Sequence, residues 1–325
     1  MRTKLALVTG ASGFVGSHLV EDLTRRGWKV RALVHSRTLP PGIPAERIRG
    51  DIQDFGLMQR ILEGVEVVFH LASALGFSRI GREKFFRINA QGTETVLRAA
   101  KRAGVKKIVH YSSAGVLGHV PSNTAADETH ALNPRDLYDR SKLEGERIAL
   151  RFAVEGLDLV VVRPGWVYGP GDRRTYKLIK AVAGRRFFLP GSGRTLQTPV
   201  HVQDLIAGTE LCLERGRPGE IYHLAGGEAL TVREMVAAVA RAAGQQPPRL
   251  RLPLLPVKVA AWLMDRAFSL AKKEAPLSPS RLAFFIHPKP LSIAKAVAEL
   301  DYAPQIRFEE GMRQTVGWYK DNGWL

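Results

Sequence analysis

Cysteine is almost absent from this chain, since Cys212 is the only one among 325 residues. A single thiol cannot close an internal disulfide, so a disulfide-stapled scaffold is excluded. The sequence also lacks an uninterrupted apolar run of about 18 residues, the length that a transmembrane helix needs. The nearest run, 256–270, is broken by Lys258, Asp265 and Arg266. We therefore expect no integral membrane segment.

The beginning of the chain lacks the features of a secretory signal. Arg2 and Lys4 precede a short apolar stretch that ends at Gly10, without a longer apolar core or a small-residue cleavage site. Together with the single cysteine, this pattern predicts a cytoplasmic protein.

Acidic residues are scarce, because 31 Asp and Glu stand against 48 Lys and Arg and leave a formal net charge of +17. Such a charge favours anionic partners. The basic residues are dispersed singly and in pairs such as Arg25-Arg26, with no nucleic-acid motif, so we expect no nucleic-acid partner and consider a phosphorylated cofactor instead. His201 and His223 have no further ligand at metal spacing, so no metal site is predicted.

Regular alternation of apolar strands and helical periods is present from residue 4 to about 164. Five runs are typical of strands, and helical patterns follow them: 4–10, 28–35, 65–72, 106–113 and 158–164. This order predicts an α/β fold with a doubly wound parallel sheet of the Rossmann kind, which binds ligands beyond the carboxyl ends of its strands.

The alternation weakens after Arg163, where Pro and Gly punctuate the chain. We assign residues 1–165 to a dinucleotide-binding domain. Residues 166–325 are expected to form a smaller, mostly helical substrate-binding region. Part of it, about 197–225, is expected to return to the first domain.

The segment TGASGFVG lies between the first strand and the first helix. Gly10 would permit a tight turn, Gly13 would let the backbone approach a pyrophosphate, and Gly16 would let the helix pack on the strand. The helix N-terminus offers N–H groups and partial positive charge to the phosphates. We therefore predict a nicotinamide dinucleotide site that also includes Ser12, Phe14 and Val15.

The end of the second strand, ALVHSR, bears on the choice of cofactor. NAD-preferring sites usually carry a carboxylate here for the ribose 2′-hydroxyl, but none stands near Val34. Arg37, helped by His35, could face a 2′-phosphate. This pattern favours NADP and leaves NAD open.

Tyr138 and Lys142 lie four residues apart in LYDRSK, so a helix would place them on one face. A tyrosine has a pKa near 10, and a neighbouring ammonium group stabilises its phenolate toward the working range. Ser113, at the end of a predicted strand, could hold the substrate oxygen, and Ser112 competes for that role.

Several motifs in order resemble the extended short-chain dehydrogenase/reductase family, from Leu5 almost to Trp324. They are TGASGFVG, GDIQD, VFHLAS, INAQGT, SSAG, YDRSK, RPGWVYGPGD and VHVQD. The resemblance implies a catalytic triad of Ser113, Tyr138 and Lys142, and by family habit a homodimer. It also implies that the cofactor is bordered by the following residues: Asp51, Ile52, Leu71, Ala72, Ser73, Asn89, Tyr138, Lys142, Pro164 and Val167.

Departures from family motifs narrow the substrate class. Ala114 and Gly115 stand where sugar dehydratases carry an acid pair, which argues against dehydration. Trp166 and Gln197 replace an asparagine and an arginine that bind the diphosphate of nucleotide sugars in the family. This weakens the case for a nucleotide-sugar epimerase. The C-terminal ending resembles 3β-hydroxysteroid dehydrogenases and dihydroflavonol-4-reductases.

The first hypothesis is an NAD(P)-dependent oxidoreductase that transfers a hydride between the nicotinamide and a secondary alcohol or ketone of a hydrophobic, steroid-, flavonoid- or terpenoid-like small molecule. Trp166, Phe187-Phe188 and Trp262 could line an apolar pocket, or they could build the core of the second region. A nucleotide-sugar 4-epimerase is the second hypothesis. A non-catalytic NAD(P)-binding sensor is the third.

Overall fold

A computed structural model describes residues 4–75, 80–270, 275 and 277–325. Its N-terminal half is built on one seven-stranded sheet with the order β11-β6-β5-β4-β1-β2-β3, in which every neighbouring pair is parallel. The strands are β1 (Leu5–Thr9), β2 (Lys29–Val34), β3 (Glu46–Arg49), β4 (Val67–His70), β5 (Lys107–Tyr111), β6 (Leu159–Pro164) and β11 (Ile221–Leu224). The prediction of a doubly wound parallel sheet is confirmed.

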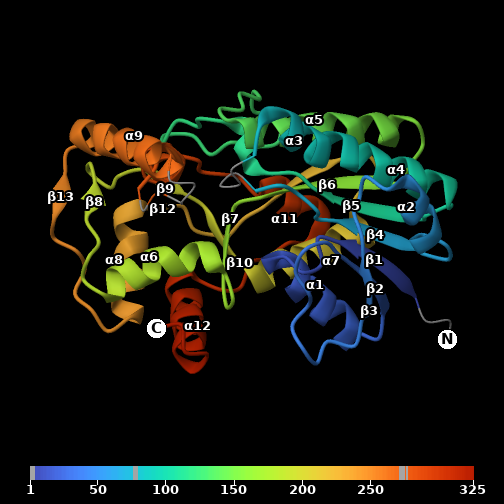
Figure 1. Cartoon of the computed structure of the whole chain (residues 1–325), viewed down its shortest axis with the longest axis horizontal. Coiled ribbons are helices and arrows are strands. Elements are labelled where there is room, and N and C mark those ends of the chain that lie inside the picture. The colour runs from blue at the N-terminus through green and yellow to red at the C-terminus, as the bar shows by residue number, and fades with distance from the viewer. Residues whose placement is uncertain (1–3, 76–79, 271–274, 276) are drawn as a thin grey trace.

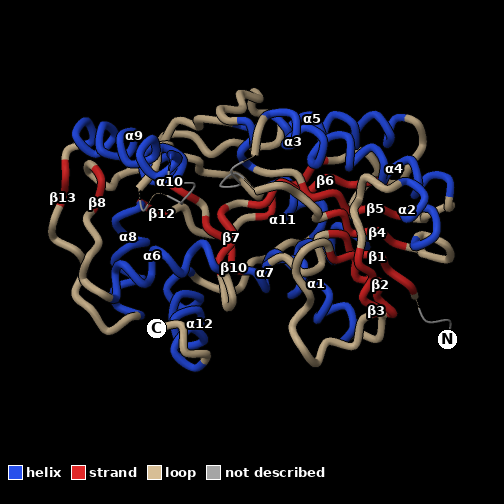
Figure 2. Tube along the Cα trace, in the orientation of Figure 1, coloured by secondary structure: helices blue, strands red, loops and turns tan. Residues whose placement is uncertain are grey.

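Helices cover both faces of this sheet (Figures 1 and 2). One layer contains α2 (Phe55–Ile61), α3 (Arg82–Phe86), α4 (Gly92–Arg102) and α5 (Leu137–Val154), and the other contains α1 (Phe14–Arg25), α7 (Val202–Arg215) and α11 (Ala294–Leu300). Strands covered on both faces are apolar throughout, which explains the fully buried run of β4.

Local signals set several helix boundaries. The Asp136 side chain accepts a hydrogen bond from the Asp139 N–H (2.8 Å), so α5 begins at Leu137. A π-helical segment (Arg87–Gln91) separates α3 from α4.

The C-terminal region packs beside the sheet and forms a core of its own (Figure 1). Its helices are α6 (Arg173–Ala183), α8 (Val232–Ala242), α9 (Leu254–Leu270), α10 (Pro279–Ile286) and α12 (Phe308–Asp321). Its short strands are β7 (Trp166–Tyr168), β8 (Leu189–Pro190), β9 (Leu196–Gln197), β10 (Pro199–His201), β12 (Leu230–Thr231) and β13 (Arg251–Leu252). In the described part of the chain, no helix combines the length and apolarity needed to span a bilayer.

Segments from the second half of the chain complete the sheet of the first half. β11 pairs with β6 at the sheet edge, and α7 packs against α1, β5 and β6. Leu300 and Tyr302 belong to the same buried cluster as Val8 and Phe69. The returning part of the chain therefore reaches beyond residue 225.

Candidate active site and dinucleotide site

The turn between β1 and α1 is shaped by three glycines. Gly10 has φ +69°, and a Cβ there would lie 2.7 Å from the Ala72 backbone nitrogen. A Cβ at Gly16 would overlap the Gly10 carbonyl oxygen, so only glycine lets α1 approach β1 this closely. Gly13 caps α1 without a side chain and donates its N–H to Gly10 O (2.9 Å). The uncovered helix N-terminus fits a pyrophosphate.

Ser12, Phe14 and Val15 complete this turn. All three side chains keep part of their surface exposed, and Phe14 and Val15 also pack against the main core. The predicted pyrophosphate-contacting residues therefore lie together at one end of the sheet.

The end of β2 brings a histidine close to a carboxylate from the next strand. His35 and Arg37 are exposed after Val34, and His35 Nε2 lies 3.8 Å from Asp51 Oδ2. Asp51 follows β3, whose last residue, Arg49, pairs with Val34. The sequence showed no carboxylate after the second strand, but the fold supplies one from the next strand.

Leu71 and Ala72 follow β4 at the same edge of the sheet and are half-buried. The Ala72 N–H donates to Thr9 Oγ1 (3.2 Å), which keeps this segment beside the glycine turn. Ile52 is buried against Gly92 of α4. These residues form the neighbouring wall of the predicted cofactor site.

Asn89 joins the segment after β4 to α5. Its Oδ1 accepts hydrogen bonds from Ala74 N (2.7 Å) and Ser73 Oγ (3.1 Å). Its Nδ2 donates to Ser141 Oγ (2.9 Å) and Ala74 O (3.1 Å). Since the amide is fully buried and hydrogen-bonded at both ends, Asn89 acts as a positioning residue between β4 and α5.

The two serines after β5 lie in different environments. Ser112 is buried and donates to Glu146 Oε2 (2.5 Å). Arg163 donates to the same carboxylate, from Nε to Oε2 (3.0 Å) and from Nη2 to Oε1 (2.5 Å). Ser113 is partly exposed, and its hydroxyl is near enough to Tyr138 to lower the pKa of that tyrosine. The geometry therefore favours Ser113 over Ser112 as the hydroxyl that meets a substrate.

Lys142 lies one helical turn after Tyr138 on α5, as the spacing predicts. Its Nζ donates to the Tyr111 carbonyl oxygen at the end of β5. Burial lowers the pKa of Lys142 to about 8, against the opposing effect of Glu146. The lysine is thus a buried cation held at the carboxyl edge of the sheet.

Tyr138 has a pKa that is raised by its surroundings. Burial is the largest cause, and the negative charge of Asp139 adds to it. Arg174 and the hydroxyl of Ser113 lower this pKa. Arg174 was not anticipated from the sequence, because its charge acts on Tyr138 only in the folded chain.

Asp139 is a second residue that the sequence reasoning missed. Its carboxylate occupies the space that a side chain at Gly115 would fill, and Ser113 Oγ lies 3.0 Å from the same point. Burial raises the pKa of Asp139 to about 6, while Lys289 opposes this shift and Asp136 adds to it. Residues 114 and 115 carry no acidic group, but Asp139 of α5 brings a carboxyl group to this site.

The end of β6 and the segment after it contribute Pro164 and Val167 to the predicted cofactor site. Pro164 ends β6 opposite Leu224, while Val167 lies in β7 with its side chain buried and its carbonyl accepting from Arg174 (3.3 Å). Pro164 is thus the last residue of β6, and Val167 lies beyond the carboxyl end of that strand.

Trp166 and Gln197 have structural partners. The Trp166 ring lies 4.9 Å from Phe284 and stacks on Tyr168. Gln197 Nε2 donates to the carbonyl oxygens of Phe284 (2.7 Å) and His287 (2.9 Å). In the described structure, Gln197 therefore joins β9 to α10.

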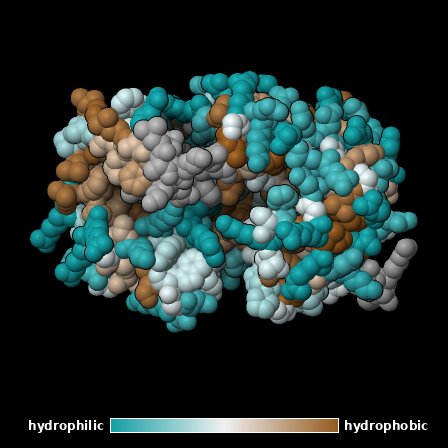
Figure 3. All heavy atoms as spheres, viewed as in Figure 1, coloured by the Kyte–Doolittle hydropathy of each residue, from teal (hydrophilic) through white to brown (hydrophobic). Residues whose placement is uncertain are grey.

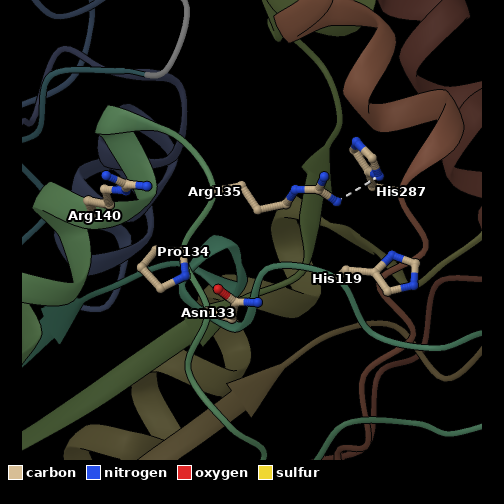
Figure 4. A pocket seen from close by; sticks show the side chains of 6 residues that line it. All are labelled: His119, Asn133, Pro134, Arg135, Arg140 and His287. Carbon is tan, nitrogen blue, oxygen red and sulfur yellow. Dashed lines mark hydrogen bonds between the residues drawn. The ribbon is translucent and has the colours of Figure 1, made fainter.

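A cavity of about 590 Å³ opens beside the start of α5 (Figure 4). Arg135 donates to His287 Nδ1 (2.9 Å), and burial with the positive charges of Arg135 and His119 lowers the pKa of His287 to about 4. The cavity is strongly cationic, and its lining residues are His119, Asn133, Pro134, Arg135, Arg140 and His287. Within the described ranges, no three His, Cys, Asp or Glu side chains gather as metal ligands.

The fold and the site define the class of protein, an NAD-dependent enzyme of the extended short-chain dehydrogenase/reductase type. The chain belongs to the NAD dependent epimerase/dehydratase family, whose model matches residues 6–225.

Similar proteins carry several activities. The chain is 32% identical to the 4-hydroxy-2-methyl-3-oxo-4-farnesyl-3,4-dihydroquinoline-1-oxide ketoreductase of Stigmatella aurantiaca, over 96% of this chain and 95% of that protein. It is 30% identical to a 3 beta-hydroxysteroid dehydrogenase/Delta 5→4-isomerase of Mycobacterium tuberculosis, over 96% and 90%.

Among solved structures, the dTDP-glucose 4,6-dehydratase DesIV of Streptomyces venezuelae, with NAD and TYD bound, matches with a TM-score of 0.80 and 29% identity. The match covers 98% of both chains. These relatives are oxidoreductases and dehydratases of one family.

Proposed function

We propose that this enzyme transfers a hydride between a nicotinamide dinucleotide and a secondary alcohol or ketone carbon of a hydrophobic small molecule. The observation that carries this proposal is the arrangement of Ser113, Tyr138 and Lys142. The hydroxyl of Ser113 is near enough to Tyr138 to lower its pKa, and the buried ammonium group of Lys142 lies one helical turn after the tyrosine.

Each residue of this triad has a distinct role in the proposed reaction. The nicotinamide, when bound, supplies or accepts the hydride. Tyr138 donates its proton to the ketone oxygen during reduction and accepts a proton from the alcohol during oxidation. Ser113 donates a hydrogen bond to the same oxygen. Lys142 favours the phenolate of Tyr138 and is placed to orient the nicotinamide ribose.

The proposed apolar substrate class, with steroid-, flavonoid- or terpenoid-like members, is supported by what the chain lacks for a diphosphate. Gln197 takes the place of a diphosphate-binding arginine, and its amide is already bonded to two carbonyl groups. The named activities of two relatives, a ketoreductase of a farnesylated quinoline and a hydroxysteroid dehydrogenase, agree with this class.

For the cofactor, we propose a preference for NADP over NAD. Exposed Arg37 and His35 at the end of β2 would face a 2′-phosphate. Asp51, 3.8 Å from His35, is the feature that favours NAD instead, because its carboxylate could take a ribose 2′-hydroxyl. Titration of the wild type and of an Arg37→Gln variant with NADPH and NADH distinguishes a preference for NADP from a preference for NAD.

The test of the proposed reaction is a Tyr138→Phe variant. With NADPH or NADH and a panel of decalones and steroid ketones, we expect the wild type to consume the reduced cofactor. We expect the variant to lose about a thousandfold in kcat, since the proton donor is gone, and to bind the cofactor unchanged. A Tyr176→Phe variant is the matched control, because that hydroxyl bonds Trp324 O in the C-terminal region.

A nucleotide-sugar 4-epimerase is the second candidate, favoured by the cationic cavity that contains Arg135 and Arg140. Conversion of a UDP-sugar without net change of the cofactor would replace the first proposal by this one. If the wild type binds the dinucleotide but converts neither class of substrate, the protein is a non-catalytic sensor. An activity that Tyr138→Phe leaves unchanged would instead refute the role given to Tyr138.

A further inference from the structure

The outer face of α9 is apolar. Leu255, Val259, Trp262 and Leu263 are 74%, 50%, 53% and 53% exposed, and Leu250, just before β13, is 60% exposed. In an α-helix, positions 255, 259, 262 and 263 fall on one side. We call these five residues the α9 patch.

The inner face of the same helix is apolar too. Val257 and Ala261 are buried in a small cluster with Leu282 of α10, and Phe188 packs against this cluster. The outer face of a surface helix normally carries polar residues, so an apolar outer face points to a partner. Figure 3 shows the hydrophobic surface at the end of the molecule where α9 and β13 lie.

Basic side chains surround the α9 patch. Arg249, Arg251, Lys258 and Arg266 are exposed, and the Arg266 guanidinium lies over the Trp262 ring, 5.4 Å from its centroid. Between residues 249 and 266 the sole acidic residue is Asp265. The surface thus combines apolar side chains, an exposed tryptophan and positive charge.

We propose that the α9 patch docks on the surface of a lipid bilayer that contains anionic lipid. Apolar residues and tryptophan enter the boundary between headgroups and acyl chains, and Lys and Arg pair with anionic headgroups. A second copy of the chain fits less well, because a two-fold contact brings the same patch, with Lys258 and Arg266, against itself. The net charge of +17 also favours binding to an anionic membrane surface.

This docking would place the substrate-binding region against the membrane. Lys258 of α9 is near enough to His287 of the cationic cavity to lower its pKa, so the inner end of α9 borders the site region. An apolar substrate dissolved in the bilayer could then reach the enzyme without crossing water. The docking itself does not depend on the proposed reaction and is measured without turnover.

The experiment is vesicle co-sedimentation of the full chain. Phosphatidylcholine vesicles with and without phosphatidylglycerol are compared at low and high salt. We expect the wild type to sediment with the anionic vesicles and to be released by salt. A Leu255→Gln/Leu263→Gln variant should bind at least about tenfold more weakly, because two large apolar side chains are lost from the buried face.

The matched control is Val154→Gln/Val297→Gln, which alters exposed valines outside the patch and should bind like the wild type. Circular dichroism verifies that each variant is folded. The proposal is overturned if the wild type sediments no better with anionic vesicles than alone, or if both double variants bind equally. It is also overturned if light scattering shows a dimer for the wild type and a monomer for the α9 variant, while neither protein binds vesicles.

Discussion

At the scale of single residues, position in space decides which of two identical neighbours is available for chemistry. Ser112 and Ser113 are adjacent, yet the hydroxyl of Ser112 is committed to the buried Glu146–Arg163 pair. Ser113 instead lies beside Tyr138 and keeps an exposed surface. The sequence left both serines open because the partners of Ser112 are 34 and 51 positions away.

Asp139 gives a prediction of pH dependence. Its negative charge raises the pKa of Tyr138, so Asp139→Asn should lower that pKa. Alcohol oxidation uses the phenolate, and its rising limb should therefore move down by about half to one pH unit in the variant. Since the pKa of Asp139 is about 6, the difference from wild type should be full above that pH and should vanish below it.

The measurement is the pH profile of kcat/KM for alcohol oxidation, from about pH 5, below the pKa of Asp139, to about pH 11, above the usual pKa of a tyrosine. Asp127→Asn serves as the control, because this exposed carboxylate does not contribute to the pKa of Tyr138. A limb that stays in place, or that moves to higher pH, would show that Asp139 does not act on the tyrosine.

At the scale of elements, the contact of α1 with β1 depends on the absence of side chains. A Gly16→Ala variant places a Cβ against the Gly10 carbonyl and should destabilise the fold by about 3 kcal/mol. It should also weaken dinucleotide binding, since α1 would move away from the turn. Gly317→Ala in α12 meets no atom within 4 Å and should stabilise by about 0.5–1 kcal/mol.

Urea unfolding and cofactor titration of these two variants test the idea. If Gly16→Ala is as stable as the wild type and binds the dinucleotide equally well, the close packing of helix on strand is not what shapes the site.

The elements that the sequence analysis did not predict share a physical reason. β3 consists of Glu46–Arg49, a charged and largely exposed edge strand without the apolar run of the inner strands. α6 follows a Pro- and Gly-rich segment, and the first turns of α6 and α10 are capped by Asp172 and Ser278. Capping and edge pairing give weaker sequence signals than apolar periodicity does.

At the scale of the whole molecule, the two halves of the chain share one core. Tyr302 lies in the cluster of the central sheet, and the Asp204 carboxylate of α7 accepts hydrogen bonds from Gln305 N and Ile306 N (3.0 Å each). We therefore expect one cooperative unfolding transition in calorimetry, which a bound dinucleotide shifts as a whole to higher temperature.

A chain that ends at residue 165 should not fold alone, because it lacks β11 and the cover provided by α7. Two separate transitions, with only one shifted by the dinucleotide, would contradict a single unit. That result would instead support independent domains at 1–165 and 166–325.

The sequence by itself determined the fold class and the family. Apolar periodicity and the glycines of TGASGFVG are local features of the sequence, so they can be recognised without the tertiary structure. Only the tertiary structure decided that Ser113 faces Tyr138, that Asp51 lies beside His35, that Asp139 fills the space at Gly115, and that α9 exposes Trp262. Each of these depends on which distant segments pack together, and packing is set by the whole chain rather than by local pattern.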